Sequence, residues 1–327
     1  MNRINRRTFI SGASAAAAAT LLGCSHSKDR QVKINDPDPQ IVDAHVHVWN
    51  LHQFRLPWLD HAGPILDRNY TVADYEQAIQ GLNIVRSYYV EVDVTPGQKE
   101  AEARYVTELC AQGKGPIRAA ILGGTPGGPG FRAYINHFKN DPHVRGVRCS
   151  FGDAIKDRNT LIDDLHFLSD LGMSFDLLLG SAMLHDAAEV VKACPQTRFI
   201  LDHCGGASPD WIAGPRANRF SFQSWKHGIS RLAANPNVCC KISGVTESGQ
   251  SPPGIEPIGQ IVNHCFDSFG PDRVLFASNW PVCLKAVTIK QWLGMVKLLV
   301  ASRPNSFRTG LFSRNADRWY CRSSDLR

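Results

Sequence analysis

Two histidines one residue apart are the first residues whose types and spacing could do chemistry. His45 and His47 stand in IVDAHVHVWN, residues 41–50, a run that otherwise indicates a buried strand. Because successive side chains of a strand point to opposite faces, both imidazoles, and Asp43 before them, are expected to share one face. Neutral imidazole is a good ligand for a divalent transition metal, so the pair suggests a metal site.

Further polar and aromatic residues lie on, end or follow other strand-like runs: Glu91, Asp93, Arg148, Asp176, His203, Lys241, Ser243, Asn279 and Trp280, with Trp49 after the first run. His203 is expected to supply a third metal ligand if these strand ends meet at one mouth. A metal held there lowers the pKa of its bound water towards about 7. The alternative interpretation is that the histidines are structural residues of the core.

Several of these residues have two interpretations. Lys241 either stabilises a developing oxyanion or forms an ion pair inside the fold, and Trp49 and Trp280 either wall a pocket or pack at its rim. Asp202 precedes His203 in the same run, so strand alternation predicts that it faces away from the site with a structural role.

The elements that must position these residues are eight strand-like runs alternating with amphipathic helical stretches such as 71–82, 98–113 and 161–172. The runs are 41–48, 84–92, 117–123, 144–150, 174–179, 198–204, 238–244 and 273–279. Strands separated by helices pair in parallel, and eight such units in residues 41–322 predict a closed α/β barrel with its active groups at the carboxyl ends of the strands. An open doubly wound sheet is the alternative, but its phosphate-binding glycine turn would occupy the position of His45 and His47.

The N-terminal segment is predicted to be an export signal. Residues 1–23 combine paired arginines with a short alanine-rich apolar stretch, which resembles a twin-arginine signal, and LLGC resembles a lipobox with Cys24 as the lipidated residue. A signal cut elsewhere, or an uncleaved anchor, is the alternative. Residues 24–40 are predicted to be a linker, so we expect a periplasmic or extracytoplasmic protein that meets the membrane only through its lipid anchor.

Composition limits the other partners. The chain of 327 residues is 43% hydrophobic, enough for a sizeable core, and its net charge is +6, half of it from Arg3, Arg6 and Arg7. Without a basic stripe or a binding motif, no nucleic-acid partner is expected. The ten cysteines contain no CxxC pair, and those inside strand-like runs (Cys149, Cys204, Cys239 and Cys240) are expected to be small buried hydrophobes. No feature indicates an oligomeric state.

Six spaced motifs resemble the amidohydrolase-related family, and more narrowly its sugar-lactonase-like branch. They are IVDAHVHVW, GVR, FILDHCGG, KISG, FGPDRVLFASNWPV and the closing LFSRNADRWY. The resemblance implies a metal-dependent TIM barrel that hydrolyses lactones or related carboxylates, although some relatives release carbon dioxide. It matches His45, His47 and His203 to the ligands of a divalent metal, zinc or manganese. It matches Arg148 to an arginine that binds a substrate carboxylate.

The chain departs from this family at two strands. The fifth run, SFDLLL, has no metal-binding histidine, and Asn279 stands where the family commonly has the aspartate of SDWPV. Asn279 cannot accept a proton, so a hydrolase needs another base, with Glu91 the first candidate and Asp176 and Asp93 after it. Three functions stay open: a lactone or ester hydrolase using metal hydroxide or metal-free water, a metal-dependent decarboxylase, and a non-catalytic barrel that binds a small molecule.

Overall fold

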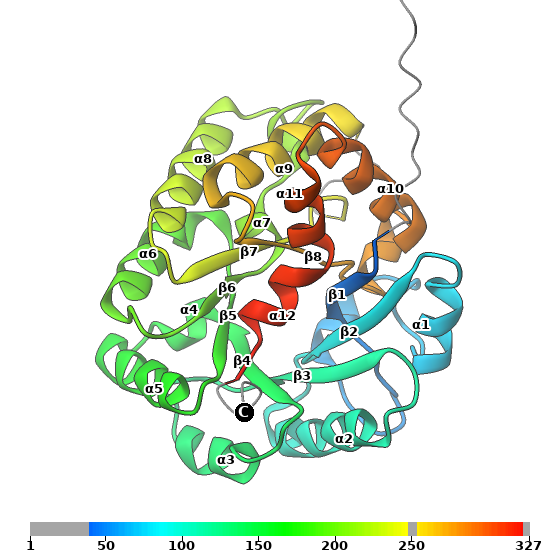
Figure 1. Cartoon of the computed structure of the whole chain (residues 1–327). Helices are drawn as coiled ribbons and strands as arrows, with labels where there is room; N and C mark the ends of the chain where they lie inside the picture. The colour runs from blue at the N-terminus through cyan, green and yellow to red at the C-terminus, as the bar shows by residue number, and fades with distance from the viewer. Residues whose placement is uncertain (1–38, 248–253, 323–327) are drawn as a thin grey trace, which may run out of the picture. The chain divides into compact units, whose positions relative to one another are not determined.

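The computed structural model describes residues 39–247 and 254–322, which belong to one compact unit. Eight parallel strands form one sheet in sequence order (Figure 1). They are β1 (Ile41–Val46), β2 (Ile84–Val90), β3 (Ile117–Gly123), β4 (Val144–Ser150), β5 (Ser174–Leu178), β6 (Phe199–Leu201), β7 (Val238–Ile242) and β8 (Val274–Phe276). Each strand begins within a residue of its predicted start, and several end earlier than predicted.

The sheet closes between its first and last strands. Val46 forms a parallel bridge with Trp280, the His47 amide donates to the Trp280 carbonyl (2.8 Å), and the Asn279 amide donates to the His45 carbonyl (2.9 Å). Consecutive strands therefore pair from β1 to β8, and the segment after β8 joins β1, which confirms the predicted α/β barrel and excludes the open doubly wound sheet.

Helices surround the strands in Figure 1. The longer ones are α1 (Val72–Ala78), α2 (Lys99–Gln112), α3 (Phe131–Phe138), α5 (Arg158–Asp170), α6 (Leu184–Ala193), α8 (Arg219–Ala233), α9 (Ile255–Phe269) and α10 (Ile289–Val300). Local signals set their ends: Thr71 and Asp74 form a capping box on α1, and Gly113 ends α2 with a φ of 63°. The helices predicted from periodicity are thereby confirmed.

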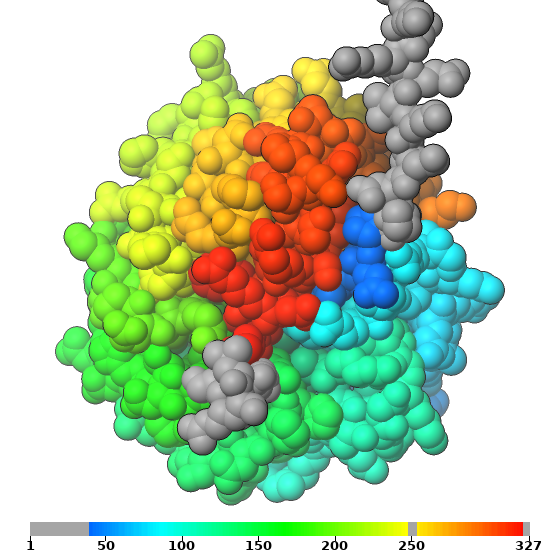
Figure 2. Space-filling view, in the orientation of Figure 1, coloured from blue at the N-terminus to red at the C-terminus, as the bar shows by residue number. Residues whose placement is uncertain are grey.

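The C-terminal segment covers the amino-terminal end of the barrel. Helix α11 (Asn305–Thr309), the π-helix η6 (Gly310–Arg314) and α12 (Asn315–Trp319) cross the strands in Figure 1 and fill the centre of the face shown in Figure 2. The side chains of Trp319 and Tyr320 pack with the apolar residues inside the barrel, among them Val42, Ala119 and Leu275. This end is therefore closed, and the open end of the barrel is the carboxyl-terminal one.

The predicted signal, Cys24 and nearly all of the predicted linker lie outside the described residues. Within the ranges 39–247 and 254–322, no helix combines the length and apolarity needed to cross a bilayer. The cysteines predicted to be small core residues are all buried and unpaired.

Candidate active site

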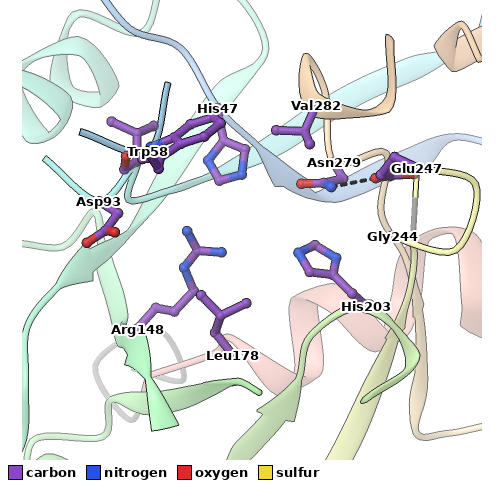
Figure 3. A pocket seen from close by; sticks show the side chains of 11 residues that line it. His47, Trp58, Asp93, Arg148, Leu178, His203, Gly244, Glu247, Asn279 and Val282 are labelled. Atoms are coloured by element: carbon purple, nitrogen blue, oxygen red, sulfur yellow. Dashed lines mark hydrogen bonds between the residues drawn. The ribbon is translucent and has the colours of Figure 1, made fainter. Parts of the chain in front are cut away.

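One cavity of about 330 Å³ opens at the carboxyl ends of the strands (Figure 3). Five of the predicted site residues line it, and they come from β1, β2, β4, β6 and β8 or the segments directly after them: His47, Asp93, Arg148, His203 and Asn279. The other lining residues are Trp58, Val92, Leu178, Gly244, Glu247 and Val282. The barrel thus brings together side chains that are far apart in the sequence, as the strand-end argument predicts.

The histidine pair on β1 lies as predicted, whereas Asp43 does not. The Nε2 atoms of His45 and His47 are 3.0 Å apart, and His47 Nδ1 lies 2.8 Å from the Val90 carbonyl. Asp43 instead accepts hydrogen bonds from the Tyr75 hydroxyl of α1 (2.8 Å) and the Ser278 amide (2.8 Å), so it faces the helical layer. The reason is an irregularity in the β1–β2 register between Asp43 and Val46, which breaks the simple alternation.

His203 joins the pair from across the barrel. Its ring centroid lies 4.6 Å from that of His45, and its Nδ1 is 2.9 Å from the Ser243 hydroxyl. His203 has a φ of 54°, in the left-handed region, and begins the short irregular turn α7 (His203–Gly206). Gly244 packs so closely that a Cβ there would lie 2.3 Å from His203 Cβ, so a glycine is required to seat the ring.

Asp202 is part of the site, which corrects the prediction that it faces away. Strand β6 ends at Leu201, so alternation no longer governs the next residues. The Asp202 carboxylate is buried, 3.0 Å from Lys241 Nζ, 3.4 Å from an Arg148 nitrogen and 3.5 Å from His45 Nδ1. Burial opposes its charge, but Lys241 and His45 hold the pKa of Asp202 well below its ordinary value.

Arg148 and Glu91 form a buried ion pair at the edge of the cavity. Arg148 Nε donates to Glu91 Oε1 (2.7 Å), and its Nη2 donates to the Glu91 carbonyl (2.6 Å). The second carboxylate oxygen of Glu91 accepts from the Asp93 amide (2.7 Å). Glu91 is 3% exposed and does not line the cavity, so its contacts are those of a residue that positions Arg148 rather than of a base open to water.

Lys241 and Asp176 lie below the cavity rather than at its mouth. Both are fully buried, and Lys241 Nζ is 2.6 Å from Asp176 Oδ2. The Tyr320 hydroxyl donates to the same oxygen from the C-terminal segment (2.6 Å). The structure therefore supports the interior ion-pair interpretation of Lys241 and places Asp176 out of reach of a substrate in the cavity, because both side chains lie below the strand ends that form the cavity.

The predicted tryptophan wall is formed by a different residue. Trp49 and Trp280 are each 1% exposed and pack against Tyr70, with ring centroids 5.1 and 5.3 Å away. Both are rim packing residues, one of the two interpretations that their sequence left open. Trp58 lines the cavity instead, with its indole nitrogen donating to the Val92 carbonyl (2.7 Å).

Glu247 is a cavity residue that the sequence reasoning missed. It lies in the segment after β7, and its Oε1 accepts from Asn279 Nδ2 (2.6 Å), the bond drawn in Figure 3. The Thr246 hydroxyl donates to its Oε2 (2.6 Å). The signal that could have found it is its place in the segment directly after a barrel strand, where functional groups gather.

The three histidines are neutral at neutral pH. Burial lowers the pKa of His47 to about 3 and that of His203 to about 4. Burial, followed by the charge of Lys241, holds the pKa of His45 well below its ordinary value. Neutral imidazoles are the form that binds metals, and the Nδ1 contacts of His47 and His203 leave Nε2 of each ring as the ligand atom.

The surroundings of His45 fit a metal in one of its two tautomers. With Nε2 as ligand, Nδ1 carries the proton and faces Asp202 Oδ1 at 3.5 Å, a buried oxygen that also lies 3.0 Å from Lys241 Nζ. In the other tautomer, Lys241 Nζ donates to Nδ1 (3.2 Å) and the Nε2 proton faces His47. Arg148, 3.4 Å from His45 Nε2, supplies a fixed positive charge at the same point. The donor set therefore suits a divalent cation and also forms a closed network without one.

A second group of potential ligands lies outside the cavity. Cys204, Cys240 and Cys265 are fully buried, and their sulfur atoms all lie within 4.8 Å of one another. Cys204 and Cys240 direct their thiols towards the Lys241 carbonyl (3.7 and 3.6 Å). The trio packs where α7, β7 and α9 meet, in agreement with the prediction that cysteines in strand runs are core residues.

Comparisons with known proteins agree with this geometry. The model of the amidohydrolase family matches residues 42–322. L-fucono-1,5-lactonase of Burkholderia multivorans is 25% identical, over 85% of this chain and 95% of that protein. L-rhamnono-gamma-lactonase of Scheffersomyces stipitis is 24% identical, over 75% and 86%. The crystal structure of an amidohydrolase from Burkholderia multivorans has the same fold, with a TM-score of 0.77. The two chains are 22% identical over 86% of this chain and 98% of that one. A second crystal form of that amidohydrolase, with a TM-score of 0.76, contains zinc.

Proposed function

The chain belongs to the amidohydrolase family, and we propose that it hydrolyses the cyclic ester of a sugar acid, a 1,4- or 1,5-lactone. The observation that carries the proposal is the convergence of His47, Arg148, His203 and Asn279 on one cavity of about 330 Å³ at the carboxyl end of the barrel. Curated relatives named as L-fucono-1,5-lactonase and L-rhamnono-gamma-lactonase support this substrate class.

The state of Arg148 favours a neutral lactone over a free carboxylate. Its Nε and Nη2 atoms already donate to Glu91, so the side-on pair of donors that binds a carboxylate is occupied. Among the residues that the structure describes, Nη1 makes only long contacts of 3.4 Å, with His45 and Asp202. This nitrogen is the donor that remains for a substrate carbonyl oxygen, where it stabilises negative charge as the ester is attacked.

The histidines would hold a divalent metal if one is bound. His45, His47 and His203 would be its ligands, and Asp202 would orient His45 by accepting its Nδ1 proton. Such a metal polarises a carbonyl and supplies hydroxide at neutral pH. In either case the chain's own residues bind the lactone against Trp58, orient its carbonyl towards Arg148 and keep the neutral rings below it.

Proton release tests the function. The full chain is incubated with L-fucono-1,5-lactone, L-rhamnono-1,4-lactone, a pyrone dicarboxylate lactone and an unsubstituted aliphatic lactone, and acid is followed with a pH indicator. We expect hydrolysis of the sugar lactones that is lost in His203→Asn and retained in His185→Asn, a matched change at an exposed helix position. Metal analysis of the same preparation shows whether activity follows metal content.

Each other outcome names an alternative. Carbon dioxide release from aromatic or unsaturated acids without acid production would identify a decarboxylase. No turnover of any compound, together with a ligand that raises the melting temperature, would identify a binding protein. Either result contradicts the lactonase proposal.

We also propose that residues 1–23 direct export and that Cys24 carries the lipid anchor. The basic start, the short apolar stretch and LLGC support this. Cys24→Ala is expected to move the protein from the membrane fraction to the soluble fraction of cells. An unchanged distribution between the two fractions would contradict the lipid anchor.

A further inference from the structure

Ester hydrolysis at this cavity needs a group that takes a proton from water, and the residues on the strands do not supply it. Asn279 reaches the cavity with an amide, which has no basic lone pair at neutral pH. Glu91, Asp176 and Asp202 are buried and paired with Arg148 or Lys241. Two carboxylates remain among the residues that line the cavity, Asp93 and Glu247.

We propose that Glu247 is the general base of the lactonase reaction and that Asn279 holds it in place. Asn279 Nδ2 donates to one carboxylate oxygen and the Thr246 hydroxyl to the other, both at 2.6 Å. Two donated hydrogen bonds fix the plane of the carboxylate, and each oxygen keeps a second lone pair that can accept from water. The inference rests on the proposed function, because it assigns a role within that reaction.

The position of Glu247 fits this role better than that of Asp93. Residues 243–247 form one short segment: Ser243 contacts the His203 ring, Gly244 packs on its Cβ, and Glu247 bonds to Asn279. Glu247 therefore lies on the side of the cavity where β6, β7 and β8 end. Figure 3 shows Asp93 across the cavity, on the side of β2.

The reaction balances with water as the second reactant. A water that donates a hydrogen bond to Glu247 attacks the acyl carbon, and its proton passes to a Glu247 oxygen. The carbonyl π electrons move to the oxygen near Arg148 Nη1 and then return, breaking the bond from the acyl carbon to the ring oxygen. The ring oxygen takes the proton from Glu247, which yields the open hydroxy acid and restores the carboxylate.

The first test compares Glu247→Gln with Glu256→Gln, the same substitution at an exposed position of α9. Glutamine keeps an oxygen for Asn279, so we expect an unchanged melting temperature and KM. Loss of the base should lower kcat by about 10²- to 10⁴-fold. Glu256→Gln should match the wild type in all three quantities.

Two further variants separate chemistry from structure. Glu247→Ala leaves room for a small carboxylate, so added formate should restore part of its kcat and should have no effect on Glu247→Gln. The double variant Glu247→Gln/Asn279→Asp moves the carboxylate to the other end of the 2.6 Å hydrogen bond, and we expect it to recover part of the lost kcat.

The outcomes are distinguishable. A wild-type chain that opens lactones while Glu247→Gln stays within about tenfold of its kcat overturns the base assignment and leaves the function standing. The same conclusion follows if formate rescue and the double variant both fail in folded protein. A wild-type chain without lactonase activity overturns the function and the base assignment together.

Discussion

The ion pair between Arg148 and Glu91 allows a quantitative test of how the cavity edge is built. Arg148 and Glu91 are 5% and 3% exposed, and Arg148 donates to Glu91 through Nε and Nη2 at 2.7 and 2.6 Å. Removing one member leaves the other charge buried, which costs about 3–5 kcal/mol in proteins. Glu91→Gln and Arg148→Met are each expected to lower the free energy of unfolding by this amount.

The double variant shows whether the two residues act as a pair. Because it removes both charges, its loss of stability should be about 2–3 kcal/mol smaller than the sum of the single losses. Urea unfolding at neutral pH, followed by circular dichroism and tryptophan fluorescence, measures all four proteins. Glu100→Gln, Arg104→Met and their double variant form the control cycle, because this Glu–Arg pair is exposed on α2 and should show little coupling.

The same variants distinguish the two roles considered for Glu91. If Glu91 were the base, Glu91→Gln would lower kcat and leave stability unchanged. If it positions Arg148, stability falls as well. A coupling no larger than that of the exposed control pair would refute the structural reasoning.

Three further predictions concern the buried charges. Burial raises the pKa of Glu102 to about 8, so between pH 4.5 and 8 the folded chain keeps a proton that the unfolded chain has lost. The free energy of unfolding should therefore fall by about 1.4 kcal/mol per pH unit across that window. Glu102→Gln should flatten this slope in urea titrations from pH 5 to 8. Lys241→Met leaves Asp176 buried without its cation and Asp202 with only the 3.4 Å contact to Arg148, so it should cost about 3–5 kcal/mol, measured by urea unfolding. A loss below that of a surface variant would contradict the buried ion pairs. Tyr320→Phe removes a donor to Asp176 and should cost about 1–3 kcal/mol of unfolding free energy. This loss should exceed that of Tyr88→Phe, because the Tyr88 hydroxyl donates to the half-exposed Asp317. Equal losses would argue against the buried contact.

The barrel could be predicted from the sequence because its signals are local and repeated. Each strand is a short β-branched or apolar run, and each helix carries its own period and its own end, such as the capping box at Thr71 or the left-handed Gly113. The convergence of His45, His47 and His203 then follows from closure, because strands of one barrel end at one rim.

The depth of a side chain along the barrel axis could not be predicted in the same way. Asp176 lies on a strand as expected, but its layer depends on the register with β4 and β6, which no local pattern contains. Asp202 was misplaced because β6 ends at Leu201 and the backbone turns left-handed at His203. Glu247 was missed because a segment beyond a strand has no period from which its direction can be inferred.

Burial and the neighbouring cations together keep His45 neutral. Arg148 and Lys241 face opposite nitrogens of His45, at 3.4 and 3.2 Å, so a proton added to that ring would meet two cations. Asp202, Glu91 and Asp176 pair with these two cations at 3.4 Å or less, so three carboxylates face two positive charges. Burial of His45, followed by the charge of Lys241, keeps its ring neutral. Asp202 can accept the Nδ1 proton of His45, and Lys241 can donate to Nδ1 when it carries no proton. These two contacts therefore stabilise either tautomer of the ring. A histidine that exchanges between a metal and a hydrogen bond requires this property.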